Sequence, residues 1–211
     1  YVNPAGNNTV PNTGEYIWAV PAGPLSETCK LKITDPGNAN ATNLSSGSYY
    51  IRGKLQVTMP NGGQNWQIYD TQAINWTKKG NLTNVNIKYS SDNGGNWTVI
   101  GANVNASSLT WNWSINNTTT TTIQGLINIS DTVLPNIVFD PSNSTFEIRG
   151  SLTILTPNDP GIVLTYDGGS SAYNITWDKV GTMNKVNLTY TKNNGTDNYP
   201  YNISLNLSSS A

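Results

Sequence analysis

The chain repeats itself with a period of about one hundred residues. The segment YYIRGKLQVTMPN (49–61) matches FEIRGSLTILTPN (146–158) at an offset of 97 residues. INWTKKGNLTNVNIKYSSDNG (74–94) matches ITWDKVGTMNKVNLTYTKNNG (175–195) at an offset of 101. Shorter matches extend the repeat upstream: IWAVP (17–21) with WNWSI (111–115), Trp18 with Trp113, and CKLKITD (29–35) with GLINISD (125–131). One immunoglobulin-like (Ig-like) sandwich has about this length, so the chain is predicted to be a tandem array of such units.

The phase of the repeat divides the chain unequally. Residues 55–150 contain every element of the repeat once, residues 1–54 contain only its last elements, and residues 151–211 contain only its first. We therefore expect one complete Ig-like unit between the second half of one unit and the first half of another. The C-terminal half would be completed by the next copy of the chain or by continuing chain.

Short runs of alternating polar and apolar residues predict an all-β fold. They are rich in β-branched and aromatic residues, and clusters of Gly, Pro, Asn or Asp separate them. The runs are LQVTM (55–59), NVNIKY (84–89), GLINIS (125–130), STFEIRG (144–150), LTIL (152–155), KVNLTY (185–190) and YNISLNL (201–207). No long helical period interrupts them, which favours tandem Ig-like β-sandwiches, one complete and two halves.

The composition argues against catalysis and against several kinds of partner. Only 11% of the residues are charged, the net charge is −1, and there is no histidine. Cys29 is the single thiol, which excludes an internal disulfide and a thiolate metal cluster. No apolar run is long enough to span a bilayer, and nothing in the charge favours nucleic acid. We expect no enzyme, no nucleic-acid partner and no membrane span.

The chain is instead rich in N-glycosylation sequons. It contains 17 Asn-x-Ser/Thr triplets, where its composition gives about 7 by chance. They begin at Asn7, Asn40, Asn43, Asn75, Asn81, Asn96, Asn105, Asn112, Asn116, Asn117, Asn128, Asn143, Asn174, Asn187, Asn194, Asn202 and Asn206. This excess predicts covalent glycans on an extracellular, cell-surface protein.

The octet SSDNGGNW (90–97) resembles the Asp-box of sialidase propellers, with Ser90, Asp92, Gly94 and Trp97 in its four fixed places. Each of these residues also suits a tight turn between strands, because Asp92 can accept backbone hydrogen bonds and Gly94 allows a positive φ. A sialidase needs an arginine cluster, and the chain has only two arginines. We interpret the octet as a structural turn. In the second copy of the motif, Asn193 replaces Asp92. Asn198 falls where Trp97 would be, with Tyr199 one place on, and we expect a looser turn there.

Two binding alternatives remain open. The loops SDNGGN and TDPGNAN (34–40) carry oxygen ligands that suit Ca²⁺, although one Asp per loop is few. We expect no other cofactor. The seven Trp residues could form a sugar-stacking face, but Trp76 and Trp177 recur with the repeat, as do Trp18 and Trp113, which favours core positions.

The motifs taken together resemble the Kre9/Knh1-type Ig-like domain of fungal cell-wall proteins and of prokaryotic surface proteins. The resemblance rests on PNTGEYIWAVPAGPLSETCKLKITDPGN (11–38), PNGGQNW (60–66) and INWTKKGNLTNVNIKYSSDNGGNWTVI (74–100). It implies an extracellular structural or wall-associated role, with no catalytic residues to carry over. It becomes weaker in 151–195, where PNDP replaces PNGG.

These observations predict a surface filament whose copies join head to tail, the tail of one and the head of the next completing one sandwich by strand complementation. The alternative is an adhesin or a carbohydrate-binding module of a surface protein.

Overall fold

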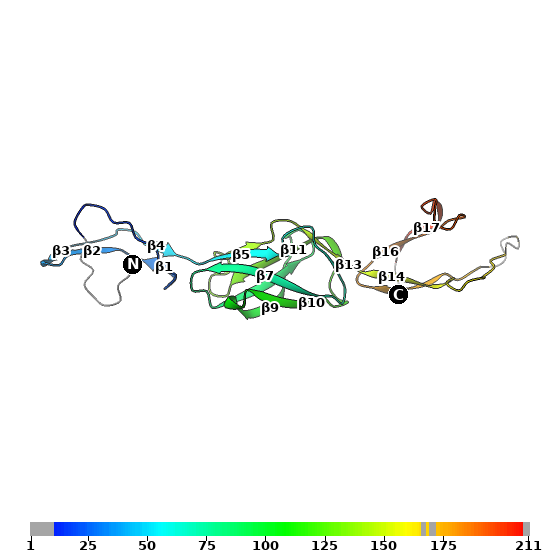
Figure 1. Cartoon of the computed structure of the whole chain (residues 1–211), viewed down its shortest axis with the longest axis horizontal. Coiled ribbons are helices and arrows are strands. Elements are labelled where there is room, and N and C mark those ends of the chain that lie inside the picture. The colour runs from blue at the N-terminus through cyan, green and yellow to red at the C-terminus, as the bar shows by residue number, and fades with distance from the viewer. Residues whose placement is uncertain (1–10, 166–167, 169–171, 209–211) are drawn as a thin grey trace.

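The computed structural model describes residues 11–165, 168 and 172–208. These residues form β-strands and one short 3₁₀ turn, η1 (Ala106–Ser108), so the all-β prediction is confirmed. The chain is elongated, with a two-layered unit in the middle and a thinner, open segment at each end (Figure 1). The segment before Lys54 is called the N-half below, and the segment after Gly150 is called the C-half.

The middle unit is a sandwich of two sheets. Its strands are β5 (Lys54–Met59), β6 (Asn65–Gln67), β7 (Thr71–Lys79), β8 (Asn84–Ser90), β9 (Thr98–Asn105), β10 (Thr110–Ser114), β11 (Thr122–Asp131), β12 (Phe139–Pro141) and β13 (Phe146–Arg149). One sheet has the order β10-β7-β5. The other has the order β6-β13-β11-β8-β9, and β12 pairs with β11. All pairs are antiparallel except β6 with β13.

The hydrophobic core lies between these two sheets. Its 18 buried residues fall between Leu55 and Ile148, within the range predicted for the complete unit. Alternation along the strands places every second side chain inside, and Ile127 and Ile129 of β11 are fully buried. Four aromatic rings meet at one end of the core, because Trp66, Tyr89, Trp113 and Phe146 make four ring contacts with centroids 4.8–6.2 Å apart.

The N-half and the C-half each consist of two separate two-stranded ribbons. The N-half contains β1 (Ser26–Cys29), β2 (Lys32–Asp35), β3 (Asn38–Leu44) and β4 (Tyr49–Ile51), paired β1-β4 and β2-β3. The C-half contains β14 (Ser151–Thr156), β15 (Thr176–Val180), β16 (Lys185–Tyr190) and β17 (Tyr201–Ser208), paired β14-β15 and β16-β17. A two-stranded ribbon has no second layer to cover its apolar face, and such ribbons are marginally stable alone.

Each half is joined to the middle unit by a hydrogen bond at a turn. On the N-terminal side, the N–H of Asn81 donates to the carbonyl of Ala22 at 2.7 Å. On the C-terminal side, the N–H of Thr121 donates to the hydroxyl of Thr182 at 3.0 Å. Thr182 and Asn81 are equivalent in the repeat, so successive units meet through equivalent turns.

Candidate assembly interfaces

The ribbons of the N-half keep the strand registers of the middle unit. The pairs in β1-β4 are Ser26↔Ile51 and Cys29↔Tyr49, where β11-β13 has Thr122↔Ile148 and Gly125↔Phe146. The pairs in β2-β3 are Lys32↔Leu44, Ile33↔Asn43 and Thr34↔Thr42, where β11-β12 has Asn128↔Pro141, Ile129↔Asp140 and Ser130↔Phe139. Adding 96 to the residue numbers in β1 and β2, and 97 to those in β3 and β4, gives the paired residues of the middle unit. The N-half therefore supplies the equivalents of β11, β12 and β13.

The ribbons of the C-half do the same for the other part of the unit. The register of β14-β15 runs from Ser151↔Val180 to Thr156↔Thr176, and that of β5-β7 runs from Lys54↔Lys79 to Met59↔Asn75. The irregularity between Val57 and Met59 recurs between Ile154 and Thr156. The register of β16-β17 likewise matches that of β8-β9, with Tyr190↔Tyr201 in place of Tyr89↔Thr98.

Residues that form the core of the middle unit have exposed equivalents in the N-half. Ile127 and Ile129 are each 0% exposed. Their equivalents, Leu31 and Ile33, are 56% and 72% exposed. The same alternation is present in both strands, but in the N-half no second sheet covers it.

The C-half shows the complementary pattern. Leu55 and Val57 of β5 are 2% and 1% exposed, whereas their equivalents in β14, Leu152 and Ile154, are 51% and 54% exposed. Tyr190, the equivalent of buried Tyr89, is 44% exposed. These apolar side chains are exposed because the C-half, like the N-half, has no second sheet to cover them.

Two segments have the sequence of a strand but do not form one. Residues 15–20 include the match to β10, and residues 162–164 follow PN as β6 does, yet neither is in a strand. In the middle unit β10 pairs with β7, and β6 pairs with β13. The equivalents of those partners, β15 and β4, lie in the opposite half of the chain. Each segment therefore lacks its partner within its own half.

The octet at residues 90–97 forms the turn between β8 and β9. The hydroxyl of Ser90 donates to Asp92 Oδ1 at 2.7 Å and accepts from the N–H of Gly94 at 2.9 Å. Asp92 also accepts from the N–H of Asn96 at 2.8 Å and from its side-chain amide at 2.7 Å. These two hydrogen bonds and the one from Ser90 lower the pKa of Asp92 from its ordinary value to about 2. Gly94 has φ +91° and lies against the ring of Trp97. Every fixed position of the motif thus has a contact within the turn.

The second copy of this turn is closer to the first than its sequence predicts. The Thr191 hydroxyl accepts from the N–H of Gly195 at 3.2 Å, as Ser90 does from Gly94. It also contacts Asn193 Oδ1 and Asp197 Oδ1, and it donates its one proton to one of these two oxygens. The ring of Tyr199, and not Asn198, takes the place of Trp97, because its hydroxyl lies 3.1 Å from where a Cβ of Gly195 would stand. Two additional residues precede β17, so simple counting along the chain selects the wrong residue.

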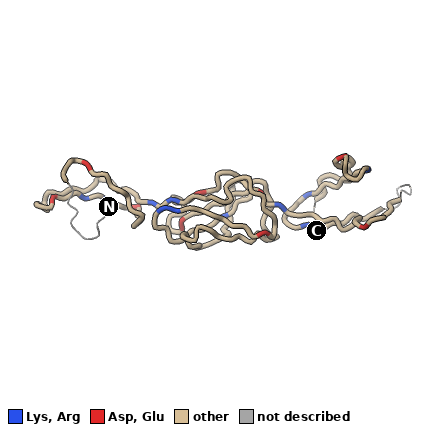
Figure 2. Tube along the Cα trace, in the orientation of Figure 1, with Lys and Arg blue, Asp and Glu red and all other residues tan. Residues whose placement is uncertain are grey.

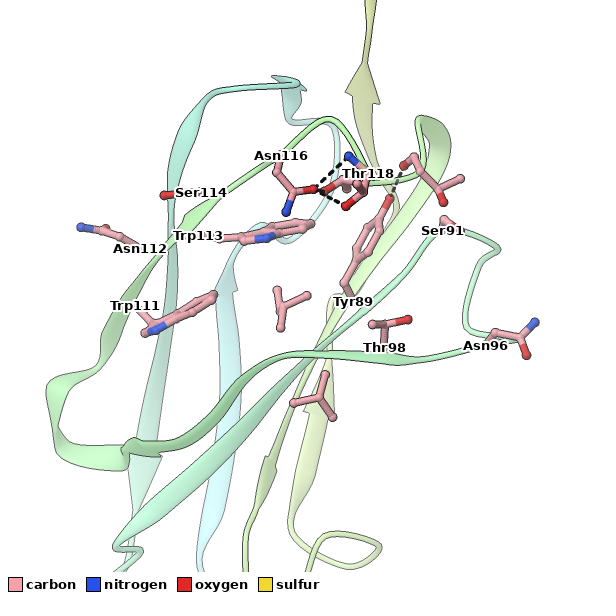
Figure 3. Close-up of a pocket in the computed structure, with 14 residues that line it drawn as sticks. Tyr89, Ser91, Asn96, Thr98, Trp111, Asn112, Trp113, Ser114, Asn116 and Thr118 are labelled. Carbon is pink, nitrogen blue, oxygen red and sulfur yellow. Dashed lines mark hydrogen bonds between the residues drawn. The ribbon is translucent and has the colours of Figure 1, made fainter. Parts of the chain in front are cut away.

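A groove of about 580 Å³ opens between β9 and β10, which are edge strands of the two sheets of the middle unit. Figure 3 shows Trp111 and Trp113 on one side of it and Tyr89, Thr98 and Asn96 on the other. None of its 14 lining residues is charged. Among the seven Trp residues, Trp66, Trp76 and Trp113 are buried, and Trp18, Trp97, Trp111 and Trp177 are half-buried. No row of exposed Trp side chains is present for sugar stacking.

Most of the predicted glycosylation sites lie on the surface. Asn7 is outside the described residues. Of the other 16 sequon asparagines, 14 are exposed, and only Asn75 and Asn128 are half-buried, in β7 and β11. Asn128 Oδ1 and the hydroxyl of Ser130, from the same triplet, are buried without a hydrogen-bond partner. That sequon is the least accessible of the set.

The loops considered for Ca²⁺ make ordinary turns. Asp35 Oδ1 accepts from the N–H of Gly37 at 2.9 Å. The carboxylate of Asp92 accepts hydrogen bonds from Ser90 and Asn96 within its own turn. In the part of the chain that the structure describes, no three His, Cys, Asp or Glu side chains gather into a metal-binding group. Acidic and basic residues are scattered thinly along the chain (Figure 2). No helix within the described ranges is long and apolar enough to cross a membrane.

Sequence reasoning missed one set of polar residues that the structure singles out. Asp140 and Ser142 reach from the six-stranded sheet to the end of β5, and their equivalents are Asn43 and Ser45. The signal was present in the repeat, since both pairs fall at an offset of 97 residues, but Asp-Pro-Ser and Asn-Leu-Ser look unrelated as motifs. No family model matches the chain, and a search of curated proteins gave no significant match.

Proposed function

We propose that this chain is a structural segment of an extracellular, N-glycosylated filament in which the C-half of one copy and the N-half of the next form one complete Ig-like sandwich. The observation that carries this proposal is the agreement of strand registers. The C-half has the pairings of β5-β7 and β8-β9, and the N-half has those of β11-β12 and β11-β13. Together they supply the strands of one unit.

The pairing between copies follows from the middle unit. There, β8 pairs with β11 through Ile87↔Ile129 and Tyr89↔Ile127. The equivalent contacts place Leu188 of one copy beside Ile33 of the next, and Tyr190 beside Leu31. The unpaired segments 15–20 and 162–164 would then lie beside β15 and β4. This is strand complementation in which both partners contribute strands.

The two halves of one chain lie at opposite ends of its elongated shape, so in the proposed assembly they join halves of other copies (Figure 1). A contact between two different surfaces does not close on itself, so repeated addition gives an open filament. The sequons are placed mostly on exposed side chains, which agrees with a glycan coat on a chain that has few charges. The resemblance of the motifs to Kre9/Knh1-type domains of cell-wall proteins supports the same role.

The proposal is tested with two variants of the full chain that each block one face. Ile33→Asp places a charge on the N-half face, and Leu152→Asp places one on the C-half face. Unmodified chains should form polymers in light scattering and electron micrographs, and each variant alone should remain monomeric. A mixture of the two variants should give dimers that do not grow, because each dimer retains only blocked ends.

Ile123→Asp is the matched control, since Ile123 is 72% exposed on the middle unit, as Ile33 is on the N-half. This variant should polymerise like the unmodified chain. Polymers from both blocked variants alone, or a mixture that contains only monomers, would contradict the proposed assembly.

The groove between β9 and β10 supports a second candidate, a binding site for a neutral oligosaccharide. Its lining combines an indole, Trp111, with amide and hydroxyl groups, and it carries no charge. A glycan array probed with the full chain and with Trp111→Ala would test it. Signals that are lost in the variant would favour an adhesin or a carbohydrate-binding role.

A further inference from the structure

Two polar side chains connect the sheets of the middle unit near the end of β5. Asp140 Oδ2, on β12, accepts from the N–H of Val57 at 2.7 Å. The hydroxyl of Ser142 donates to the carbonyl of Pro60 at 2.7 Å and accepts from the N–H of Ile127 at 3.1 Å. Ser142 is buried, so these hydrogen bonds satisfy groups that have no access to water.

Half of this arrangement is already present in the N-half. In β3, Asn43 takes the position that Asp140 has in β12. Ser45, just after β3, takes the position of Ser142. Ser45 accepts from the N–H of Leu31 at 3.1 Å, as Ser142 does from Ile127, and its backbone pairs with Leu31 in the same way. Its hydroxyl, however, donates to the nearby carbonyl of Gly47 at 3.0 Å. The equivalent of Pro60 is Pro157, which belongs to the C-half.

The other half of the arrangement is present in the C-half. Strands β14 and β15 keep the register and the bulge of β5 and β7, which puts Ile154 in the position of Val57. The donor N–H of Ile154 and the acceptor carbonyl of Pro157 therefore stand where Val57 and Pro60 stand in the middle unit. In a sandwich completed by two copies, Asn43 and Ser45 of one copy face Ile154 and Pro157 of the other.

We propose that Asn43 and Ser45 form a polar pair that fixes the register between copies: Asn43 Oδ1, which accepts from the N–H of Leu44 at 2.7 Å in the single chain, turns to the N–H of Ile154, and the Ser45 hydroxyl moves from Gly47 to the carbonyl of Pro157. This inference rests on the proposed function and deepens it. It also changes the meaning of the triplet Asn43-Leu44-Ser45, which has the form of a sequon. Its asparagine and its serine are both used at the contact between copies, so Asn43 carries no glycan in assembled chains.

In the middle unit, the residues equivalent to Asn43-Leu44-Ser45 make their contacts within one chain. Its triplet is Asp140-Pro141-Ser142, which keeps the acceptor and the hydroxyl but cannot be glycosylated. A carboxylate accepts a stronger hydrogen bond than an amide oxygen does. The polar pair between copies is therefore a weaker form of a contact that is permanent within the middle unit.

The test measures the dissociation constant of the dimer formed by the two blocked chains, produced without glycosylation. Variants of Asn43 are placed on the Leu152→Asp chain, whose N-half is intact, and titrated with the Ile33→Asp chain. Asn43→Leu leaves the Ile154 N–H without an acceptor and should weaken the dimer about 5- to 150-fold. Asn43→Asp restores the acceptor of the middle unit and should tighten the dimer about fivefold. A gain of affinity cannot arise from misfolding.

Asn40 is the matched control. It is another exposed sequon asparagine of β3, and its equivalent, Ile137, remains 44% exposed in the middle unit. Asn40→Leu and Asn40→Asp should leave the dissociation constant unchanged. If the Asn43 and Asn40 variants behave alike while the dimer forms, the polar pair is refuted and the assembly stands. If the two blocked chains form no dimer at all, the proposed function is refuted, and this inference with it.

Mass spectrometry of glycopeptides from a glycosylating host gives an independent readout. In the polymer fraction, fragmentation of the peptide that contains both Asn40 and Asn43 should localise any sugar to Asn40 and none to Asn43. A polymer whose Asn43 is glycosylated would overturn the inference.

Discussion

The middle unit and the two halves have the same strands but differ in what covers them. In the middle unit, β11 lies in a six-stranded sheet, and its Ile129 is 0% exposed. In the N-half, β2 has the same register with its neighbour, yet Ile33 is 72% exposed. Local pairing is therefore set by the segment itself, whereas burial requires the other half of the unit. The comparison shows that, within one chain, strands can pair in their final register without forming a hydrophobic core.

Apolar truncations should show the largest contrast between the two regions. Ile129→Ala removes a fully buried side chain and should lower the free energy of unfolding by ~2–5 kcal/mol. Ile33→Ala, in a chain kept monomeric by Leu152→Asp, should change it by less than about 0.5 kcal/mol. Urea unfolding followed by tryptophan fluorescence measures both. Equal losses would mean that the N-half has a core of its own.

Assembly should remove this contrast. In dimers of the blocked chains, Ile33→Ala should weaken the association by an amount comparable to a partial core truncation, because Ile33 is then covered by the partner. Analytical ultracentrifugation measures the shift. An unchanged dissociation constant would show that β2 lies outside the contact.

The stability of the junctions between units should fall when a single methyl group is added at a glycine. A Cβ at Gly53 would lie 2.7 Å from Leu82 Cδ2, and a Cβ at Gly150 would lie 2.1 Å from the carbonyl oxygen of Val180. Gly53→Ala and Gly150→Ala should each destabilise their junction by ~1–3 kcal/mol, and Gly150→Ala should cost more because it meets rigid backbone. Limited proteolysis around each junction reads this out. Gly47→Ala is the control, since no atom lies within 4 Å of a Cβ there.

The two turns should differ least, and only in acid. Hydrogen bonds from Asn96 and Ser90 lower the pKa of Asp92 to about 2, so ionised Asp92 stabilises the folded turn above its unfolded pKa. This contribution is lost as the pH falls from about 4 towards 2. In the C-half, Asn193 holds the position of Asp92 and does not titrate, and the carboxylate of that turn is Asp197, which contacts Thr191 from a different position. Hydrogen–deuterium exchange at pH 5 and pH 2.5 should show acid-dependent opening at residues 90–97, and Asp92→Asn should abolish that dependence.

The sequence predicts the strands well and their coverage poorly. The repeat identifies β14 and β15 as copies of β5 and β7, and the structure reproduces their registers pair for pair. Residues 17–21 match 111–115 in the repeat, but the structure has no strand there, because a strand needs a hydrogen-bonding neighbour that the N-half does not contain. The alternation of polar and apolar residues in a segment does not show which other segment is close enough to pair with it.

The candidate interface was visible in the sequence only in outline. The phase of the repeat predicts two halves, and alternation predicts which side chains are apolar. The pair Asn43 and Ser45 could not be identified as contact residues, because their role depends on Ile154 and Pro157, which lie more than a hundred residues away. Counting along the repeat puts Asn198 at the place of Trp97 and Tyr199 one place on, and the extra residues in that loop explain why the aromatic ring comes from Tyr199.

The most direct test of completion between copies is a disulfide that only the proposed register allows. Ile87 and Ile129 are partners across β8 and β11, and cross-strand Cβ atoms lie about 4.5–5.5 Å apart. Their equivalents are Leu188 and Ile33. With Cys29→Ser in both chains, a mixture of the Ile33→Cys chain and the Leu188→Cys chain is oxidised, denatured and weighed by mass spectrometry. Completion between copies should give a disulfide-linked dimer, and none when Asn187→Cys, on the opposite face of β16, replaces Leu188→Cys. Equal yields from the two mixtures, or no dimer from either, would contradict it.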